Sequence, residues 1–242
     1  MRGPVLLSLL ALTALLAVGV ASAAPEQQTS DFGLAGPAVA SSSLAQRIHG
    51  CVACHGPQGQ GGGSGGYAPR IGGDPAGYIY DQLKNFQTGR RRYPLMTWMV
   101  QYLPDPYMHE IAAYFSQQTV PARPRSQQPA VSPATLAIGR KLVLQGDPTR
   151  HIPACTACHG AQLAGAEPDV PALLGDDAVY IGAQLSAFKQ GVRGSKGPNW
   201  MHAMAAKLSG QEINAIAAWL ATQPIPAGAK PMPAGSVKFP FQ

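Results

Sequence analysis

All four cysteines of the chain lie in two short motifs in which a histidine directly follows the second cysteine. The motif C-x-x-C-H occupies residues 51–55 and returns at residues 155–159. Thiols three residues apart face the same side when the segment is helical. Such a pair could bind a metal ion, cycle as a dithiol or bond covalently to a larger group, and the adjacent imidazole is a metal ligand. The residues with this chemistry are Cys51, Cys54, His55, Cys155, Cys158 and His159.

Covalent attachment of a c-type haem fits this motif best. Two thiols can form thioether bonds to the two vinyl groups of one haem, and the next histidine can then bind the iron. A structural zinc site would bring two C-x-x-C pairs into one cluster, whereas here each pair lies in its own part of the chain. A redox dithiol does not need a histidine after each second cysteine, and a disulfide within so short a motif would be strained. The sequence therefore predicts two covalently bound haem c groups, with His55 and His159 as iron ligands.

A sixth iron ligand distinguishes an electron carrier from a haem enzyme with an open iron position. Each half of the chain offers a Met-x-x-Met pair that begins 41 or 42 residues after the motif histidine. A methionine thioether raises the reduction potential of a haem. We expect Met96 and Met201 to be the ligands, because each lies seven residues before a matched leucine. Met99 and Met204 are then expected to fill the core, which is the usual role of methionine.

The two motifs belong to a longer internal repeat. Residues 51–56, 78–89, 96–99 and 111–115 each have a counterpart 102 to 105 residues later, in the same order. A period near 104 is too long for a solenoid, so the sequence predicts two tandem copies of one domain. Four histidines have no counterpart in the other copy and are expected to be ordinary polar residues: His49, His109, His151 and His202.

The fold class expected for both copies is all-α. Apolar residues follow helical spacing over residues 81–88 and 109–118, and Ser209 and Glu212 form a capping box before another helical stripe. No segment shows the sustained alternation typical of a strand. With 28 Gly and 23 Pro in 242 residues, the helices should be short and the loops plentiful. The charged fraction of 12% excludes a long coiled coil.

The N-terminus has the features of a signal peptide. A basic start precedes an apolar run over residues 5–20 and an Ala-Ser-Ala cleavage site, and the run is short for a membrane-spanning helix. An uncleaved anchor is the alternative. The expected parts are a signal peptide over 1–23, a flexible lead-in over 24–44, domain 1 over 45–119, a proline-rich linker over 120–134, domain 2 over 135–223 and a proline-rich tail over 224–242.

Charge and glycine content give weaker signals. The net charge of +6 is modest, and an exported protein is not expected to bind nucleic acid. Residues 90–92 form a run of three arginines, which we expect to be a solvated face, with a docking patch for an acidic partner as the alternative. Residues 59–66 are glycine-rich and are expected to form a flexible loop beside the haem. A phosphate-binding loop is disfavoured because no Lys-Ser/Thr follows.

Residues from about 45 to 223 resemble the diheme class I cytochromes c of the cytochrome c4 type. The paired C-x-x-C-H-G sequences, the repeated Tyr-x-x-x-Gln-Leu with a following Phe, and Pro69 and Pro171 carry the resemblance. It implies two tandem all-α domains related by a pseudo-twofold axis, with the haem propionates approaching across the interface. It also implies that the first methionine of each pair is the ligand, and that the carbonyl groups of Pro69 and Pro171 accept hydrogen bonds from the proximal imidazoles.

The resulting functional prediction is a periplasmic electron carrier and not an enzyme. The resemblance implies that a quinol-oxidising complex or a dehydrogenase donates electrons, and that a terminal oxidase or reductase accepts them. It allows peripheral association with the membrane. The alternatives are a cytochrome subunit of a periplasmic oxidoreductase, a diheme enzyme such as a peroxidase, and a haem-bearing sensor or scaffold.

Overall fold

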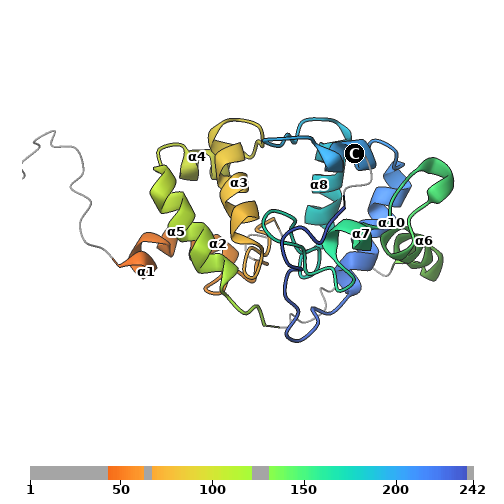
Figure 1. The fold of residues 1–242 in the computed structure, drawn as a ribbon, viewed down its shortest axis with the longest axis horizontal. Coiled ribbons are helices and arrows are strands. Elements are labelled where there is room, and N and C mark those ends of the chain that lie inside the picture. The colour runs from red at the N-terminus through yellow and green to blue at the C-terminus, as the bar shows by residue number, and fades with distance from the viewer. Residues whose placement is uncertain (1–42, 63–66, 122–130, 239–242) are drawn as a thin grey trace, which may run out of the picture. The chain divides into compact units, whose positions relative to one another are not determined.

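The computed structural model describes residues 43–62, 67–121 and 131–238. The expected signal peptide, the lead-in up to residue 42 and the middle of the linker lie outside the described residues. Within those ranges the chain forms helices and loops, with isolated bridges and no strand, which confirms the all-α class (Figure 1). None of the described helices is long and apolar enough to cross a membrane.

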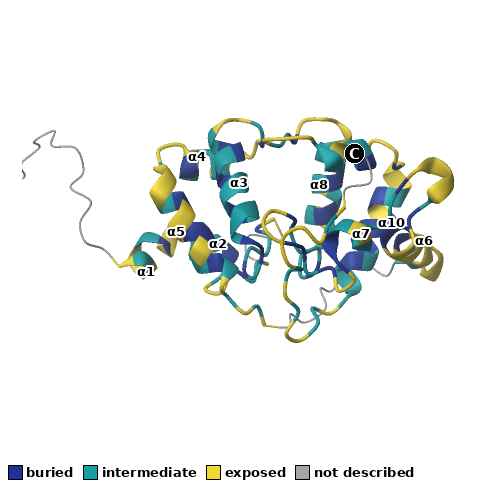
Figure 2. Ribbon diagram, viewed as in Figure 1, coloured by how far each residue is buried: buried dark blue, intermediate teal, exposed yellow. Residues whose placement is uncertain are grey.

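Domain 1 packs three of its helices around one hydrophobic core. Helix α3 contacts both α4 and α5. Buried residues recur at helical spacing along α5, at Met108, Ile111, Ala112 and Phe115. Figure 2 shows that α5 has both buried and exposed parts. This pattern is that of an amphipathic helix with one stripe against the core. The helices of domain 1 are α1 (Leu44–Arg47), α2 (His49–His55), α3 (Ala76–Gln87), α4 (Pro94–Val100) and α5 (Asp105–Ser116).

Domain 2 has a separate core built around α10, which packs against α6 and α8. A Cβ on Gly139 of α6 would stand 2.1 Å from the carbonyl oxygen of Ala215 on α10, so only glycine permits this close approach. The elements of domain 2 are α6 (Pro133–Leu144), the short 3-10 helix η2 (Pro148–Arg150), α7 (Cys155–His159), α8 (Ala178–Lys189), α9 (Trp200–Ala205) and α10 (Gly210–Thr222).

Helix α6 begins at Pro133, inside the segment expected to be linker. The Ser132 side chain caps the helix by accepting a hydrogen bond of 3.1 Å from the Thr135 N–H. Proline is favoured at the first helical position, because its fixed φ suits a helix and its missing N–H has no partner there. Pro133, which was expected to belong to the linker, is therefore the first residue of α6.

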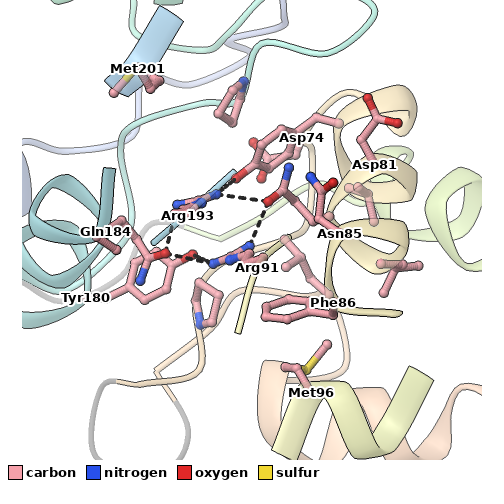
Figure 3. Close-up of a pocket in the computed structure, with 18 of the residues that line it drawn as sticks. Asp74, Asp81, Asn85, Phe86, Arg91, Met96, Tyr180, Gln184, Arg193 and Met201 are labelled. Carbon is pink, nitrogen blue, oxygen red and sulfur yellow. Dashed lines mark hydrogen bonds between the residues drawn. The ribbon is translucent and has the colours of Figure 1, made fainter. Parts of the chain in front are cut away.

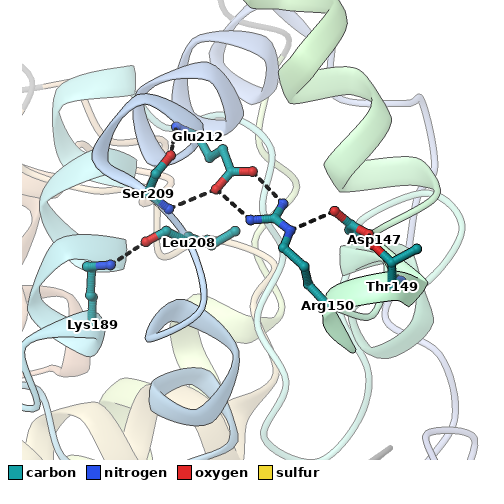
Figure 4. A network of polar contacts seen from close by, with 7 residues as sticks. All are labelled: Asp147, Thr149, Arg150, Lys189, Leu208, Ser209 and Glu212. Carbon is teal, nitrogen blue, oxygen red and sulfur yellow. Dashed lines mark hydrogen bonds and ion pairs between the residues drawn. The ribbon is translucent and has the colours of Figure 1, made fainter.

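A polar network fastens the start of α10 to η2 (Figure 4). Ser209 Oγ accepts from the Glu212 N–H at 3.2 Å, and the Glu212 carboxylate accepts from the Ser209 N–H at 2.8 Å, which confirms the expected capping box. The guanidinium of Arg150 donates to both carboxylate oxygens of Glu212 and, through Nε, to Asp147 Oδ2 at 2.6 Å. The Glu212 carboxylate thus caps α10 and also binds Arg150 of η2.

The tail after α10 contains no helix within the described residues, as its prolines predict. It returns to domain 2 instead. The Met232 N–H donates to the Gly165 carbonyl at 2.9 Å, and the Glu167 N–H donates to the Met232 carbonyl at 2.8 Å. These bonds hold the tail against the loop that follows α7.

The described part of the glycine-rich loop makes backbone hydrogen bonds. The Gly61 N–H donates to the His55 carbonyl at 2.8 Å, and the Gly62 N–H donates to the Ala68 carbonyl at 3.0 Å. Gly61 and Gly62 have φ of +74° and +82°, a conformation that favours glycine. The described glycines at 59–62 therefore close a hydrogen-bonded turn after the haem-attachment helix, and the flexibility expected for the loop stays a prediction.

Candidate haem sites

Each C-x-x-C-H motif lies on a short helix that ends at its histidine. The helices α2 and α7 stop at Gly56 and Gly160, whose φ values of +81° and +82° break the helical path. The four cysteines are half-buried and form no disulfide. The helical spacing places both thiols of a motif on one side, and all four cysteines line one cavity.

That cavity has a volume of about 1230 Å³ and lies between the two domains. It exceeds the roughly 300–1,000 Å³ of a typical pocket for one drug-sized ligand. Both C-x-x-C-H motifs and both Met-x-x-Met pairs contribute to its lining, with apolar side chains of both cores between them. The dimensions and the donor set fit two large, flat, mostly apolar groups.

The two motif histidines are fixed by matched hydrogen bonds. Nδ1 of His55 donates to the Pro69 carbonyl at 2.8 Å, and Nδ1 of His159 donates to the Pro171 carbonyl at 2.8 Å. Burial lowers the pKa of both imidazoles, an effect that the carbonyl partners oppose, so both rings are neutral near pH 7. A neutral ring with its proton on Nδ1 keeps the Nε2 lone pair for a metal. The proline bonds are those that the resemblance implies.

The thiols are not set up as free nucleophiles. Burial raises the pKa of Cys155 to about 12 and raises the pKa of Cys51 and Cys158 as well. Thiols that cycle as dithiols or bind zinc have a lowered pKa, because the thiolate is the reactive form. This environment disfavours both the redox dithiol and the zinc site.

The methionines face the motifs from α4 and α9. Met96 and Met201 are half-buried and line the cavity on either side of a central polar cluster (Figure 3). Met204 is buried in the core of domain 2, and Cε of Met99 lies 3.1 Å from where a Cβ on Gly50 would stand. Met204 is thus more buried than Met201, whereas Met96 and Met99 are both half-buried, and all four methionines line the cavity. The assignment of Met96 and Met201 as the ligands stays a prediction.

None of the other four histidines lines this cavity. Nδ1 of His202, the neighbour of Met201, donates to the Phe188 carbonyl at 2.7 Å. His109 stacks on Tyr80 with ring centroids 3.9 Å apart. These two rings are engaged in structural contacts away from the motifs.

Sequence analysis missed a pair of buried arginines in the centre of the cavity (Figure 3). Arg91 is 9% exposed and donates from Nη2 to the Tyr180 hydroxyl at 2.8 Å. Arg193 is 6% exposed and donates from Nη2 to the Tyr78 hydroxyl at 3.0 Å. Each guanidinium also donates to the amide oxygens of both Gln82 and Gln184.

Each arginine also lies over an aromatic ring of its own domain. The guanidinium carbon of Arg91 is 4.6 Å from the ring centroid of Phe86, and that of Arg193 is 4.4 Å from that of Phe188. Arg91 and Arg193 are 102 residues apart, the same offset as the two phenylalanines. Extending the repeat by these few residues would have revealed the pair.

The arginine run at 90–92 is therefore not a solvated face. Arg91 is buried, and Nε of Arg90 donates to Asn85 Oδ1 at 2.7 Å. Only Arg92 is exposed. Composition could not predict which of the three arginines is buried, because burial depends on which side chain the loop turns towards the partner domain.

The two buried guanidinium groups are positively charged, so anionic partners would stabilise them. Their hydrogen bonds go to neutral side chains, and the Asp176 carboxylate interacts electrostatically with Arg91. A buried charge without a counter-charge is costly. Haem propionates are carboxylates, so Arg91 and Arg193 could neutralise the propionates of haems held in this cavity.

Comparison with known proteins agrees with this site. The cytochrome c family model matches residues 42–119 and matches again over residues 137–224. The chain belongs to the cytochrome c family. With two such domains and two C-x-x-C-H motifs, this cytochrome carries two covalently bound haem c groups.

Its relatives include proteins named cytochrome c4 and thiosulfate dehydrogenase electron acceptor. This cytochrome is 38% identical over 175 residues to a thiosulfate dehydrogenase electron acceptor from Thiomonas intermedia, spanning 72% of this chain and 79% of that one. Reduced cytochrome c4 from Pseudomonas stutzeri has a similar structure, with a TM-score of 0.64, 30% identity and coverage of 74% of this chain and 96% of that one. Thiosulfate dehydrogenase (TsdBA) from Marichromatium purpuratum matches with a TM-score of 0.63 and 34% identity, over 72% of this chain and 36% of that one. This cytochrome is accordingly a diheme electron carrier of the cytochrome c4 type.

Proposed function

We propose that this cytochrome is a periplasmic carrier that accepts single electrons from a thiosulfate dehydrogenase and passes them to a downstream redox protein. The observation that carries the proposal is the matched arrangement of the two domains, in each of which a motif histidine and a methionine line the cavity. If these residues held the iron from both sides, no position would remain for a substrate on the metal. Haem c supplies a one-electron Fe(III)/Fe(II) couple at each site.

Different side chains would hold different parts of the two haem groups. Cys51, Cys54, Cys155 and Cys158 would provide the thioether bonds. His55 and His159 would bind on the proximal side, each oriented by its proline carbonyl, and Met96 and Met201 on the distal side. Arg91 and Arg193 would neutralise the propionates at the interface, where the apolar walls exclude water.

The partner assignment is supported by the similarity to thiosulfate dehydrogenase electron acceptors and by an asymmetry between the domains. Around α4, domain 1 exposes Tyr93, Leu95, Trp98 and Tyr102, with Trp98 67% exposed. Near α9 of domain 2, the residues that correspond to Trp98 and Tyr102 are an alanine and a lysine. An exposed apolar patch beside the methionine-bearing helix suits a brief redox encounter, whereas α9 has no exposed large apolar side chain among the described residues.

The first experiment tests the closed ligand sets. Absorption spectra of the haem-loaded protein should show a methionine-to-iron charge-transfer band with the intensity of two haems, and carbon monoxide should not bind to the reduced form. A band for one haem or none, together with carbon monoxide binding or peroxide turnover, would favour the diheme enzyme instead.

The second experiment tests the donor. Purified thiosulfate dehydrogenase and thiosulfate should reduce the cytochrome, and Trp98→Ala or Leu95→Ala should slow the second-order rate about tenfold, or about 1.4 kcal/mol. Ile138→Ala on α6 is the matched control, because Ile138 is 49% exposed and Leu95 is 50% exposed. Reduction only by a quinol-oxidising complex would identify a respiratory donor, and a stoichiometric partner on purification would identify a permanent subunit.

A further inference from the structure

One amide group in domain 1 is hydrogen-bonded at both ends. The carbonyl of Pro69 accepts from Nδ1 of His55 at 2.8 Å. The N–H of the same amide, which belongs to Arg70, donates to Oδ1 of Asp176 at 2.7 Å. Asp176 belongs to domain 2. A chain of two hydrogen bonds therefore joins a carboxylate of one domain to the haem-motif histidine of the other.

Domain 2 contains the reciprocal chain. The Pro171 carbonyl accepts from Nδ1 of His159 at 2.8 Å, and the N–H of the same amide, that of Ala172, donates to Oδ1 of Asp74 at 2.8 Å. Asp74 lies in domain 1, and its position precedes that of Asp176 by 102 residues. The same arrangement thus occurs twice, in opposite directions across the interface.

We infer that each domain sets the reduction potential of the other domain's haem through an aspartate–amide–histidine chain that crosses the interface. The inference rests on the proposed role of His55 and His159 as iron ligands. Asp74 and Asp176 act as positioning residues, because they touch the amide and not the haem iron.

The physical basis is the polarisation of the amide. A carboxylate that accepts the N–H pulls the amide dipole towards itself and makes the carbonyl oxygen a stronger acceptor, since bonds in such a chain strengthen one another. The imidazole Nδ1–H then donates more strongly, and Nε2 becomes a better electron donor to the metal. A more basic ligand stabilises Fe(III) and lowers the reduction potential of that haem.

The two chains are not equivalent, although they share one geometry. Asp74 is 5% exposed, whereas Asp176 is half-buried. The side chain of Arg70 extends over the interface, where Nη1 donates to the Leu174 carbonyl at 2.7 Å, and domain 2 has Ala172 at the matched position. The Arg70 cation, which also acts on Asp74, has no counterpart in domain 2, so the two haems should differ in reduction potential.

The test uses the haem-loaded, full-length protein and the variants Asp176→Asn and Asp74→Asn. Asparagine keeps an acceptor oxygen for the amide and removes the charge, so the fold is retained. Potentiometric titration should show that each variant raises the potential of one haem by about 59 mV, which is a tenfold change in the ratio of Fe(III) to Fe(II) for a one-electron couple. The double variant should raise both potentials.

Nuclear magnetic resonance of the reduced protein identifies the haem concerned. With labelled histidine, Asp176→Asn should shift the Nδ1–H signal of His55 towards that of a weaker hydrogen bond and leave that of His159 in place. Asp74→Asn should do the opposite. Asp81→Asn is the matched control, because Asp81 lines the same cavity but accepts from neither amide.

Equal shifts of both haems in every variant would overturn the inference, because they would show a general effect of charge. Unchanged potentials and unchanged Nδ1–H signals would overturn it too. Both outcomes differ from a failure of the proposed ligands, which would appear in the unsubstituted protein as a missing methionine-to-iron band or as carbon monoxide binding.

Discussion

Arg91 of domain 1 donates from Nη2 to the hydroxyl of Tyr180 in domain 2 at 2.8 Å. The same bond runs in the opposite direction from Arg193 to Tyr78 at 3.0 Å. The repeat has thus placed one arginine and one tyrosine of each domain in mutual contact. Because these side chains also line the cavity, the interface between the domains and the haem environment are one structure.

The first prediction concerns the stability of that interface. Arg91→Leu leaves the Tyr180 hydroxyl without its buried donor, while Arg193 still donates to Gln184, so the free energy of unfolding should fall by about 1–3 kcal/mol. Arg92→Leu is the matched control, since Arg92 is exposed, and it should change the value by less than about 0.5 kcal/mol. Denaturant unfolding of the haem-loaded protein measures both, and equal effects would mean that the buried network contributes nothing.

The second prediction concerns the distal ligands. Met96→Leu should remove about half the intensity of the methionine-to-iron band and lower the potential of one haem, because a thioether favours Fe(II). Met201→Leu should do the same for the other haem. Met99→Leu and Met204→Leu should keep the band, since leucine replaces methionine in a packed core at small cost. The reverse result would assign the second methionine of each pair as the ligand.

The third prediction concerns pH. Burial raises the pKa of Asp74 to about 7, with Arg70 and the Ala172 N–H lowering it and Asp176 raising it. Asp74 is neutral below this pH and charged above it. By the chain described above, the potential of the domain 2 haem should therefore fall as the pH rises through about 7.

The variant Asp74→Asn should remove this part of the pH dependence. Asp169→Asn, at an exposed position on the rim of the cavity, should leave it in place. Potentiometric titrations at a series of pH values decide the matter. A slope that persists in Asp74→Asn would assign it to other groups, the haem propionates included.

The fourth prediction concerns acid stability. Hydrogen bonds from Arg150, and then from Ser209, lower the pKa of Glu212 to about 2, although partial burial raises it. A lowered pKa in the folded state stabilises the protein above the unfolded-state pKa, and this contribution is lost as the pH falls from about 4 to about 2. Glu212→Gln keeps the cap but loses the ion pair, so the free energy of unfolding at pH 7 should fall by about 0.5 kcal/mol.

The difference between Glu212→Gln and the unsubstituted protein should shrink as the pH approaches 2, where the carboxyl group becomes neutral. Denaturant unfolding at pH 7 and at low pH measures this convergence. A constant difference would show that the substitution acts through packing and not through charge.

The local chemistry of this protein could be predicted from residue types and short spacings. The C-x-x-C-H motifs predicted two haem groups, and helical periodicity with the Ser209–Glu212 capping box predicted helices that the structure contains. Such features depend on residues three or four positions apart, whose relative geometry is set by the helix itself. The internal repeat also predicted two domains, because two copies of one sequence pattern are expected to adopt the same fold.

The sequence by itself could not determine which side chains the two domains present to each other. Arg91, between two other arginines, has no local mark of burial, and its partners Tyr180 and Gln184 are about ninety residues away. Asp74 and Asp176 likewise act on amides about a hundred residues distant. Contacts of this kind depend on how two complete domains pack, so only the tertiary structure decided that each domain's histidine is linked to a carboxylate of the other.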